Sequence, residues 1–191
     1  DEPDNAYPVT ALPGSHQMHY TVNRVPNMTF DELQEQTEGG FKRLGVLRMD
    51  VDDLGDIFKY GLGELATLAR LSTLSFQVSL FFEGWVKHIC ESKTYQGLVY
   101  AVYAGGDDVF LIGPWDRMPG LAVSIRDDFQ RYTGQHPKTH LSAGLAFIGG
   151  KYPIYQAAAD AKDALGQAKD LTGKEAFSFL GTAWKWTDFE K

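Results

Sequence analysis

The chain has 191 residues, 43% hydrophobic and 23% charged, a composition typical of a globular protein of about one domain and not of a disordered chain. Its formal net charge of −7 argues against broad, non-specific nucleic-acid binding by this chain alone, and no apolar run approaches the roughly 18 residues of a membrane span. The single cysteine, Cys90, excludes an intrachain disulfide and a cysteine-rich zinc site, which is typical of a reducing cytoplasm.

The first part of the chain, residues 1–43, is predicted to be a lead-in segment with a short helix, followed by one domain over residues 44–191. Four prolines and the lack of any period in the first 28 residues predict a loop or an extended segment. Thr29 and Glu32 then have the spacing of a capping box and predict a short helix, which the next glycine pair ends.

An acidic turn follows the first predicted strand, residues 44–51. The strand carries Asp50 near its end, and the turn adds Asp52, Asp53 and Gly55. These carboxylates can join those of another strand if the two strands are antiparallel, with the end of one beside the start of the other.

A long helix is predicted over residues 64–91. Apolar side chains recur there at helical spacing, which indicates a face packed in the core and not a cofactor site. The side chains in this stripe are Val78, Phe81, Trp85 and Ile89.

A hairpin is predicted over residues 98–113, where two apolar strands meet at Gly105 and Gly106. Glycine takes the positive φ of a tight turn without strain. Asp107 and Asp108 follow directly, although adjacent aspartates repel each other and are poor strand formers. A bound cation would explain them, and a solvated hairpin tip is the alternative.

The C-terminal part is predicted to alternate helices and strands. Apolar spacing predicts helices over residues 118–132 and from residue 154 to the glycine at 173, and strands are predicted over residues 139–147 and 175–180. One face of the first of these strands, which includes Ser142, is small. That face can seat a ligand or accommodate a closely packed helix.

The predicted order is strand, helix, hairpin, helix, strand, then an extra helix and strand. This is an α+β fold whose first part is the ferredoxin-like βαββαβ palm arrangement, with an antiparallel central sheet. Its first and third strands are neighbours, so Asp50 is expected beside Asp107. Side chains alternate along a regular strand, so we expect one of Asp107 and Asp108 to be the main metal ligand and the other a second ligand or a proton handler.

Clustered carboxylates, with the backbone carbonyl of Val51, suit Mg²⁺ or Mn²⁺, which prefer oxygen ligands and share their coordination with substrate phosphates. Two such ions about 4 Å apart can activate a 3′-hydroxyl and stabilise a pyrophosphate leaving group, which is nucleotidyl transfer. Positive charge for the phosphates is available from Lys162, Lys169 and Lys174, for which a solvated surface position is the alternative.

Several of these segments together resemble known palm domains. The arrangement is similar to that of GGDEF-type diguanylate cyclases, adenylate cyclases and polymerases, with Gly-Gly-Asp-Asp in place of the GGDEF sequence. More specifically, the chain from about Thr29 to its C-terminus resembles the large subunit of type III-A CRISPR effector complexes. The segments that carry this resemblance are Gly45–Gly55, Val102–Trp115, Leu141–Gly144 and Lys151–Ile154.

The resemblance implies an enzyme that makes cyclic oligoadenylates from ATP when its complex binds target RNA. It implies Asp50, Asp107 and Asp108 as catalytic residues that, with the Val51 carbonyl, bind two Mg²⁺ or Mn²⁺ ions. Diguanylate cyclases carry a guanine-reading asparagine where this chain has Phe58, which weakens a guanine assignment. The nucleotide-binding residues that the resemblance implies are Gly105, Gly106, Asp52, Asp53, Gly55, Phe58, Ser142, Lys169 and Lys174.

Three parts of that family's large subunit are missing from this sequence: a His-Asp nuclease motif, a cysteine-rich zinc segment and a second palm domain. We therefore interpret the chain as the GGDD palm of a larger or split protein, without DNA cleavage and without a membrane. Its expected partners are ATP, other subunits of a type III complex with guide and target RNA, and a second palm or second copy. Two other hypotheses stay open: a GTP-using dinucleotide cyclase, and a non-catalytic module that binds nucleotide or a partner subunit.

Overall fold

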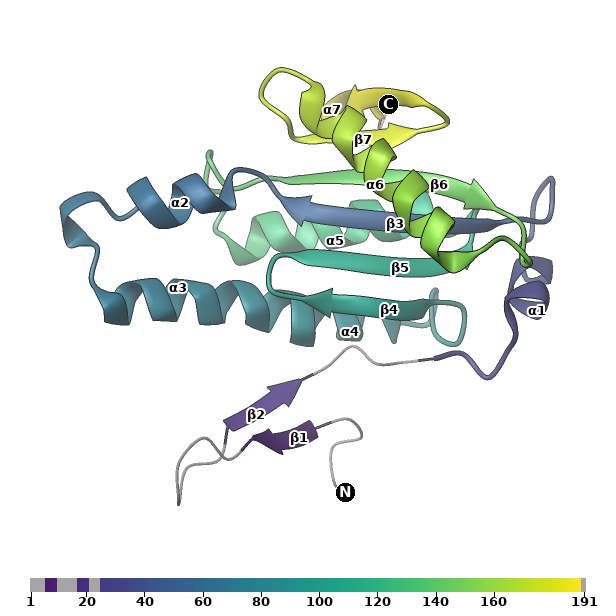
Figure 1. Cartoon of the computed structure of the whole chain (residues 1–191), viewed down its shortest axis with the longest axis horizontal. Helices are drawn as coiled ribbons and strands as arrows, with labels where there is room; N and C mark the ends of the chain where they lie inside the picture. Colours follow the sequence, from purple (N-terminus) through teal and green to yellow (C-terminus); the bar gives the residue numbers. More distant parts are fainter. Residues whose placement is uncertain (1–5, 10–16, 21–24, 190–191) are drawn as a thin grey trace.

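The computed structural model describes residues 6–9, 17–20 and 25–189. Its centre is a six-stranded sheet in the order β4-β5-β3-β6-β7-β8 (Figure 1). β6 and β7 pair in parallel, and the other neighbours are antiparallel. The strands are β3 (Leu44–Val51), β4 (Tyr100–Gly105), β5 (Asp108–Pro114), β6 (Leu141–Ile148), β7 (Ala176–Phe179) and β8 (Thr182–Lys185).

The strand order confirms the predicted βαββαβ arrangement. The strands β3, β4, β5 and β6 are its four strands, and β3 lies between β5 and β6, antiparallel to both. The first and third strands of the motif are therefore neighbours near the centre of the sheet, and the end of β3 lies beside the start of β5.

Two helices cover one face of this sheet, α1 (Phe30–Glu35) and α6 (Ile154–Asp170). The predicted capping box begins α1: Glu32 N donates to Thr29 Oγ1 at 3.3 Å, and Thr29 N donates to Glu32 Oε2 at 2.8 Å. The packing interpretation of the small face of β6 is confirmed at Gly144, where an added Cβ would collide with the backbone of α6. Both helices enclose a small core with the strands. Its buried members are Leu33, Leu44, Val46, Phe110, Ile112, Ile148, Ala157 and Ala161.

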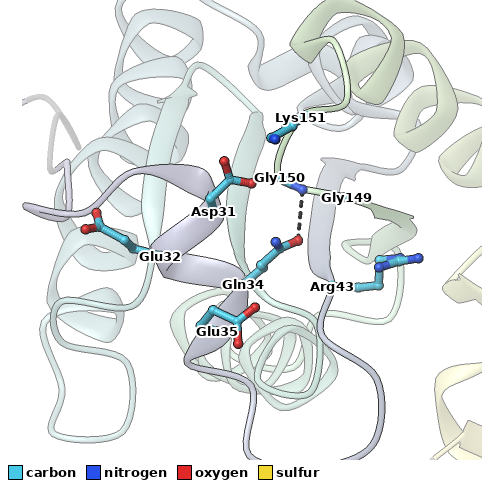
Figure 2. Close-up of a pocket in the computed structure, with 8 residues that line it drawn as sticks. All are labelled: Asp31, Glu32, Gln34, Glu35, Arg43, Gly149, Gly150 and Lys151. Atoms are coloured by element: carbon cyan, nitrogen blue, oxygen red, sulfur yellow. Dashed lines mark hydrogen bonds between the residues drawn. The ribbon is translucent and has the colours of Figure 1, made fainter.

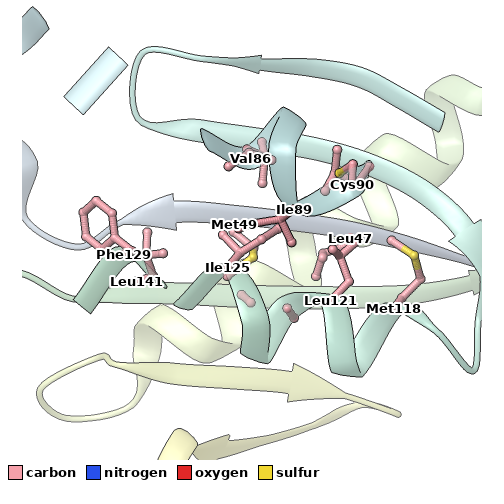
Figure 3. Close-up of a cluster of buried hydrophobic side chains, with 14 of the residues drawn as sticks. Leu47, Met49, Val86, Ile89, Cys90, Met118, Leu121, Ile125, Phe129 and Leu141 are labelled. Carbon is pink, nitrogen blue, oxygen red and sulfur yellow. The ribbon is translucent and has the colours of Figure 1, made fainter. Parts of the chain in front are cut away.

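The larger core lies on the other face, between the sheet and the helices α4 (Val86–Cys90) and α5 (Met118–Tyr132) (Figure 3). Helix α5 was predicted with these bounds, and its apolar stripe is buried as its spacing indicated except at the last residue, Tyr132, which is 43% exposed. Among the helices of the described residues, none is long and apolar enough to cross a membrane.

The long helix predicted over residues 64–91 is divided. It consists of η1 (Gly63–Leu65), α3 (Leu68–Leu80), one π-helical turn, η2 (Phe81–Trp85), and α4. A further helix, α2 (Leu54–Tyr60), was not predicted. The π turn adds a residue to the helical period, so Val86 is fully buried and Trp85 is 46% exposed. The prediction that Trp85 lies in the core was wrong for this reason, whereas Phe81 and Ile89 are buried as predicted.

Two hairpins lie outside the predicted elements. At the C-terminal edge, Leu180 and Gly181, with φ of 54° and 74°, turn β7 into β8, and α7 (Trp186–Phe189) follows. Leucine is uncommon at positive φ, so of the two turn residues only Gly181 indicated a turn in the sequence. Near the N-terminus, β1 (Ala6–Val9) pairs with β2 (Gln17–Tyr20) inside the predicted lead-in, and the rest of its first 24 residues lie outside the described residues.

Candidate functional site

The acidic end of the sheet is where β3 ends and β5 begins. Asp50 lies directly opposite Asp108 in the antiparallel ladder, so the two side chains are on one face. The expectation that Asp107 takes this position was wrong by one residue. Gly105 pairs with Asp108, which leaves Gly106 and Asp107 as the two turn residues. The hairpin therefore turns one residue later than the glycine pair.

One hydrogen bond joins this turn to β3, and another lies within the hairpin itself. Gly106 has a φ of +63°, which glycine adopts freely. Val51 N donates to the carbonyl of Asp107 at 3.1 Å, and Tyr103 Oη donates to the carbonyl of Gly105 at 3.0 Å. Tyr103 was not among the predicted site residues, because a tyrosine in an apolar strand has the same pattern as a packing residue.

The carboxylates of this end repel one another. Burial, and then the negative charges of Asp50 and Asp108, raise the pKa of Asp107. Burial also raises the pKa of Asp108, against the effect of Arg48, whose Nη2 donates to Asp108 Oδ2 at 3.0 Å. Arg48 was missed by the sequence analysis, although its place two residues before Asp50 puts both on one face. A divalent cation would relieve this repulsion.

Two lysines bring positive charge to the acids. Lys169, near the end of α6, donates from Nζ to Asp50 Oδ1, and Lys174, beyond that helix, donates from Nζ to Asp53 Oδ1. The hydrogen bond to Asp53 raises the pKa of Lys174. Lys162 is exposed on α6, and none of the interactions described for the acids involves it. The tertiary structure therefore selects two of the three predicted lysines.

Asp52 and Ser142 face the interior. Asp52 is 3% exposed and Ser142 is fully buried. Asp52 Oδ2 accepts hydrogen bonds from Ser142 Oγ at 2.9 Å and from Glu175 N at 3.0 Å. Burial raises the pKa of Asp52, and its hydrogen bonds oppose that rise. Glu175 had not been predicted as a site residue.

The other predicted nucleotide-binding residues lie on α2, which continues from the end of β3 away from the sheet (Figure 1). Asp53 precedes this helix with a φ of 54°, and its carbonyl accepts from Asp56 N and Ile57 N. Gly55 is exposed in the first turn of α2, and Phe58 is half-buried one turn later.

The carboxylates of the acidic end are oxygen ligands of the kind that divalent cations prefer. Within residues 6–9, 17–20 and 25–189, no three Asp, Glu, His or Cys side chains are grouped closely enough to hold an ion by themselves. Mg²⁺ commonly uses one or two carboxylates and takes its remaining ligands from water and phosphates. The arrangement can therefore bind a cation together with a phosphate-bearing ligand.

Two hollows lie away from this end. One, of about 560 Å³, is lined by α1 and by residues 149–151 at the opposite end of β3, where Gly150 N donates to Gln34 Oε1 at 2.9 Å (Figure 2). The other, of about 430 Å³, lies between α4 and α5 beside Trp85. Neither includes a predicted site residue.

Comparison with protein families gives a match over residues 43–178 to the model described as Cas10/Cmr2, second palm domain. The matched range begins just before β3 and ends within β7. It therefore includes every predicted site residue.

Two curated relatives are CRISPR system single-strand-specific deoxyribonucleases Cas10/Csm1 (subtype III-A). The protein from Methanocaldococcus jannaschii is 38% identical over 154 residues, which are 75% of this chain and 19% of the relative. The protein from Mycobacterium tuberculosis is 32% identical over 171 residues, 82% of this chain and 21% of the relative. The chain thus spans about a fifth of the length of these relatives.

Solved structures of a Csm1–Csm4 cassette are similar in fold. The complex with pppApA has a TM-score of 0.77 and 30% identity, covering 90% of this chain and 27% of the matched chain. The complex with one ATP has a TM-score of 0.77 and 31% identity at the same coverage. The complex with cA3 has a TM-score of 0.75 and 29% identity over 97% of this chain and 27% of that chain.

Proposed function

Because the chain belongs to the Cas10/Cmr2 second palm domain family, we propose that it is the palm of a metal-dependent nucleotidyltransferase that converts ATP into cyclic oligoadenylates in type III CRISPR defence. The observation that carries this proposal is the meeting of Asp50, Asp107 and Asp108 with two lysines at one end of the sheet. Relatives solved with ATP, pppApA and cA3 support the choice of adenine nucleotides.

The acidic end fits a divalent cation. Its carboxylates supply the oxygen ligands that Mg²⁺ and Mn²⁺ prefer. Burial, and then repulsion by Asp50 and Asp108, raises the pKa of Asp107, and a cation would reduce that repulsion. Asp50, Asp107, Asp108 and the carbonyl of Val51 would hold two ions. When bound, these ions would activate the attacking 3′-hydroxyl and stabilise the pyrophosphate leaving group.

The chain's own residues would position the triphosphate. Gly105 and Gly106 have no side chains of their own, which would let the nucleotide approach the backbone. Lys169 and Lys174 pair with carboxylates in the structure and would exchange these partners for phosphate oxygens. Gly55 and Phe58 would then face the nucleotide from α2. Phe58 offers an apolar surface and no hydrogen bond, which disfavours selection of guanine.

We further propose that the chain acts in the cytoplasm, within a type III effector complex that carries guide RNA and binds target RNA. Relatives solved as Csm1–Csm4 subcomplexes support an assembly of this kind. Joining two nucleotides requires one 3′-hydroxyl to lie in line with the α-phosphate of the next, and such positioning is worth about 7–11 kcal/mol. A second palm or a second copy would hold the second nucleotide.

The proposal is tested by incubating the chain with ATP or with GTP and Mn²⁺ and resolving the products by mass. Cyclic or linear oligoadenylate from ATP is expected, in an amount that rises more than linearly with protein concentration if two copies must meet. Cyclic dinucleotide from GTP alone would favour the GTP-using alternative. Binding of ATP without product, even when all subunits and target RNA are present, would favour the non-catalytic module.

A matched control separates the acidic site from general loss of charge. Asp107→Ala with Asp108→Ala removes the adjacent acids of the hairpin, and Asp127→Ala with Asp128→Ala removes an adjacent pair on α5. Product should disappear in the first double variant and persist in the second. Equal losses in both would overturn the assignment of the site.

A further inference from the structure

The segment that joins α6 to β7 has an unusual backbone. Gly173, Lys174 and Glu175 follow one another with φ of 76°, 47° and 49°, all in the left-handed region. Glycine adopts this region freely, but lysine and glutamate do so only where their surroundings compensate for the strain. Asp53, which pairs with Lys174, is also left-handed, with a φ of 54°. Three of these residues, Asp53, Lys174 and Glu175, thus depend on outside contacts for their conformation.

Glu175 provides those contacts on the inner side. Its backbone N donates to the buried Asp52 Oδ2 at 3.0 Å. Its Oε1 accepts from Gln130 Nε2 at 3.4 Å and lies 3.4 Å from His140 Nδ1 and 3.9 Å from Arg126 Nη2. The side chain therefore accepts a hydrogen bond from α5 and lies close to the residue before β6, and the backbone N–H donates to the residue after β3.

Lys174 is directed to the acidic end from the same bend. Its Nζ donates to Asp53 Oδ1, and its carbonyl accepts from Lys185 Nζ on β8. The Lys174 side chain reaches Asp53, whereas the adjacent Glu175 is bonded to Asp52. Because the two residues are neighbours in the chain, holding Glu175 in place also fixes the orientation of the Lys174 side chain. A free lysine side chain samples many rotamers, and fixing the backbone from which it extends reduces the volume that its ammonium group explores.

Asp52 connects this bend to the acidic end of the sheet. One carboxylate oxygen, Oδ2, accepts from both Ser142 Oγ on β6 and Glu175 N. Asp52 is two residues from Asp50, so the segment that carries Lys174 and the strand end that carries Asp50 share a single buried anchor. A shift of the bend would therefore change the distance between the lysine and the acids.

We propose that Glu175 is a positioning residue, held by Asp52, that places Lys174 for contact with the triphosphate of the nucleotide. This inference rests on the proposed function and assigns a role to a residue that does not touch the nucleotide. Glu175 acts through Lys174, so removing it should weaken triphosphate binding in the same way as removing Lys174, and removing both should cost no more than either.

The test is a double-mutant cycle in the full chain, with ATP and Mg²⁺ as the ligand. Lys174→Ala is expected to weaken ATP binding and to raise KM about tenfold, the factor that one charge-assisted contact is worth, with kcat changed less than about twofold. Glu175→Ala should do the same. The double variant should match the single variants, because the anchor has no purpose without the lysine. Independent effects that multiply to about a hundredfold, or an unaffected Glu175→Ala, would overturn the proposal.

Two further variants serve as controls in case Glu175→Ala destabilises the chain. Glu175→Gln retains the size of the side chain and an acceptor for Gln130, so KM should rise less than in Glu175→Ala. Asp128→Ala removes an ion pair with Arg131 on α5, at 2.9 Å, and neither of these residues is among the described partners of Glu175, so KM should not change. A greater effect of Gln than of Ala, or an equal effect of Asp128→Ala, would contradict the positioning role.

The outcome also separates this inference from the proposed function. If the unmodified chain neither binds ATP nor forms product, the proposed function is wrong. If the unmodified chain is active and Lys174→Ala raises KM but Glu175→Ala does not, only the positioning role is wrong.

Discussion

The acids at the acidic end of the sheet belong to two environments, although Asp50 and Asp52 lie only two residues apart. Asp50 and Asp108 have side chains that are 30% and 23% exposed and pair with the cations Lys169 and Arg48. Asp52 is 3% exposed and accepts hydrogen bonds from a hydroxyl and a backbone amide. Substituting Asp50 and substituting Asp52, two positions apart, are therefore expected to affect different properties of the protein. The outer acids should govern ligand binding and chemistry, and the inner acid should govern stability.

The largest effect is expected from removing the partly exposed acids of the hairpin. Asp107→Ala with Asp108→Ala should reduce product formation to background, since the cation loses its carboxylate ligands. The free energy of unfolding should change by less than about 1 kcal/mol, because the deleted acids repel each other and are partly exposed. Product can be measured by mass and stability by urea unfolding. Retained turnover in a folded double variant would contradict the metal-site assignment.

The inner acid should show the reverse pattern. Asp52→Ala leaves Ser142 Oγ and Glu175 N without their buried acceptor, which should lower the free energy of unfolding by about 2–4 kcal/mol. Asp53→Ala, one residue away and with a side chain 56% exposed, is the matched control and should cost about 1 kcal/mol or less. Urea unfolding of both variants measures the difference. Equal costs would show that burial does not distinguish the two acids.

Metal binding should also distinguish the outer acids from Asp52, with a smaller effect. Mn²⁺ is expected to bind the unmodified chain weakly, and more tightly when ATP is present, because phosphates complete the coordination shell. Calorimetric titration with and without ATP measures this coupling, and Asp52→Asn should leave it in place. A Mn²⁺ affinity that is indifferent to ATP would count against shared coordination.

The smallest expected effect is a pH dependence of stability. Burial and neighbouring carboxylates raise the pKa of Asp107 in the folded state, so the folded chain holds this proton to a higher pH than the unfolded chain does. The contribution of Asp107 to stability should therefore fall as pH rises from roughly 4 through its raised pKa. The difference in melting temperature between the unmodified chain and Asp107→Asn should shift in favour of the variant over that interval. A difference that is constant with pH would contradict the repulsion.

Much of the fold was predictable because local patterns carry it. The eight residues of β3 and the fifteen of α5 were predicted with the bounds that the structure has, since each has an uninterrupted period of its own. The division of the long helix at residues 81–85 was not, because a π turn leaves no mark in side-chain chemistry. The turn at Leu180 was not predicted either, because a leucine in the sequence does not indicate a positive φ.

The sequence by itself determined that Asp50, Asp107 and Asp108 would meet at one end of the sheet, because the order of elements brings the end of β3 beside the start of β5. The tertiary structure decided the roles within it. It placed Asp108 instead of Asp107 opposite Asp50, turned Asp52 inward, and selected Lys169 over Lys162. Register, burial and helix orientation each depend on contacts between residues far apart in the chain, and no local pattern encodes them. Glu175, more than a hundred residues after Asp52, could be found only once the fold had placed the two in contact.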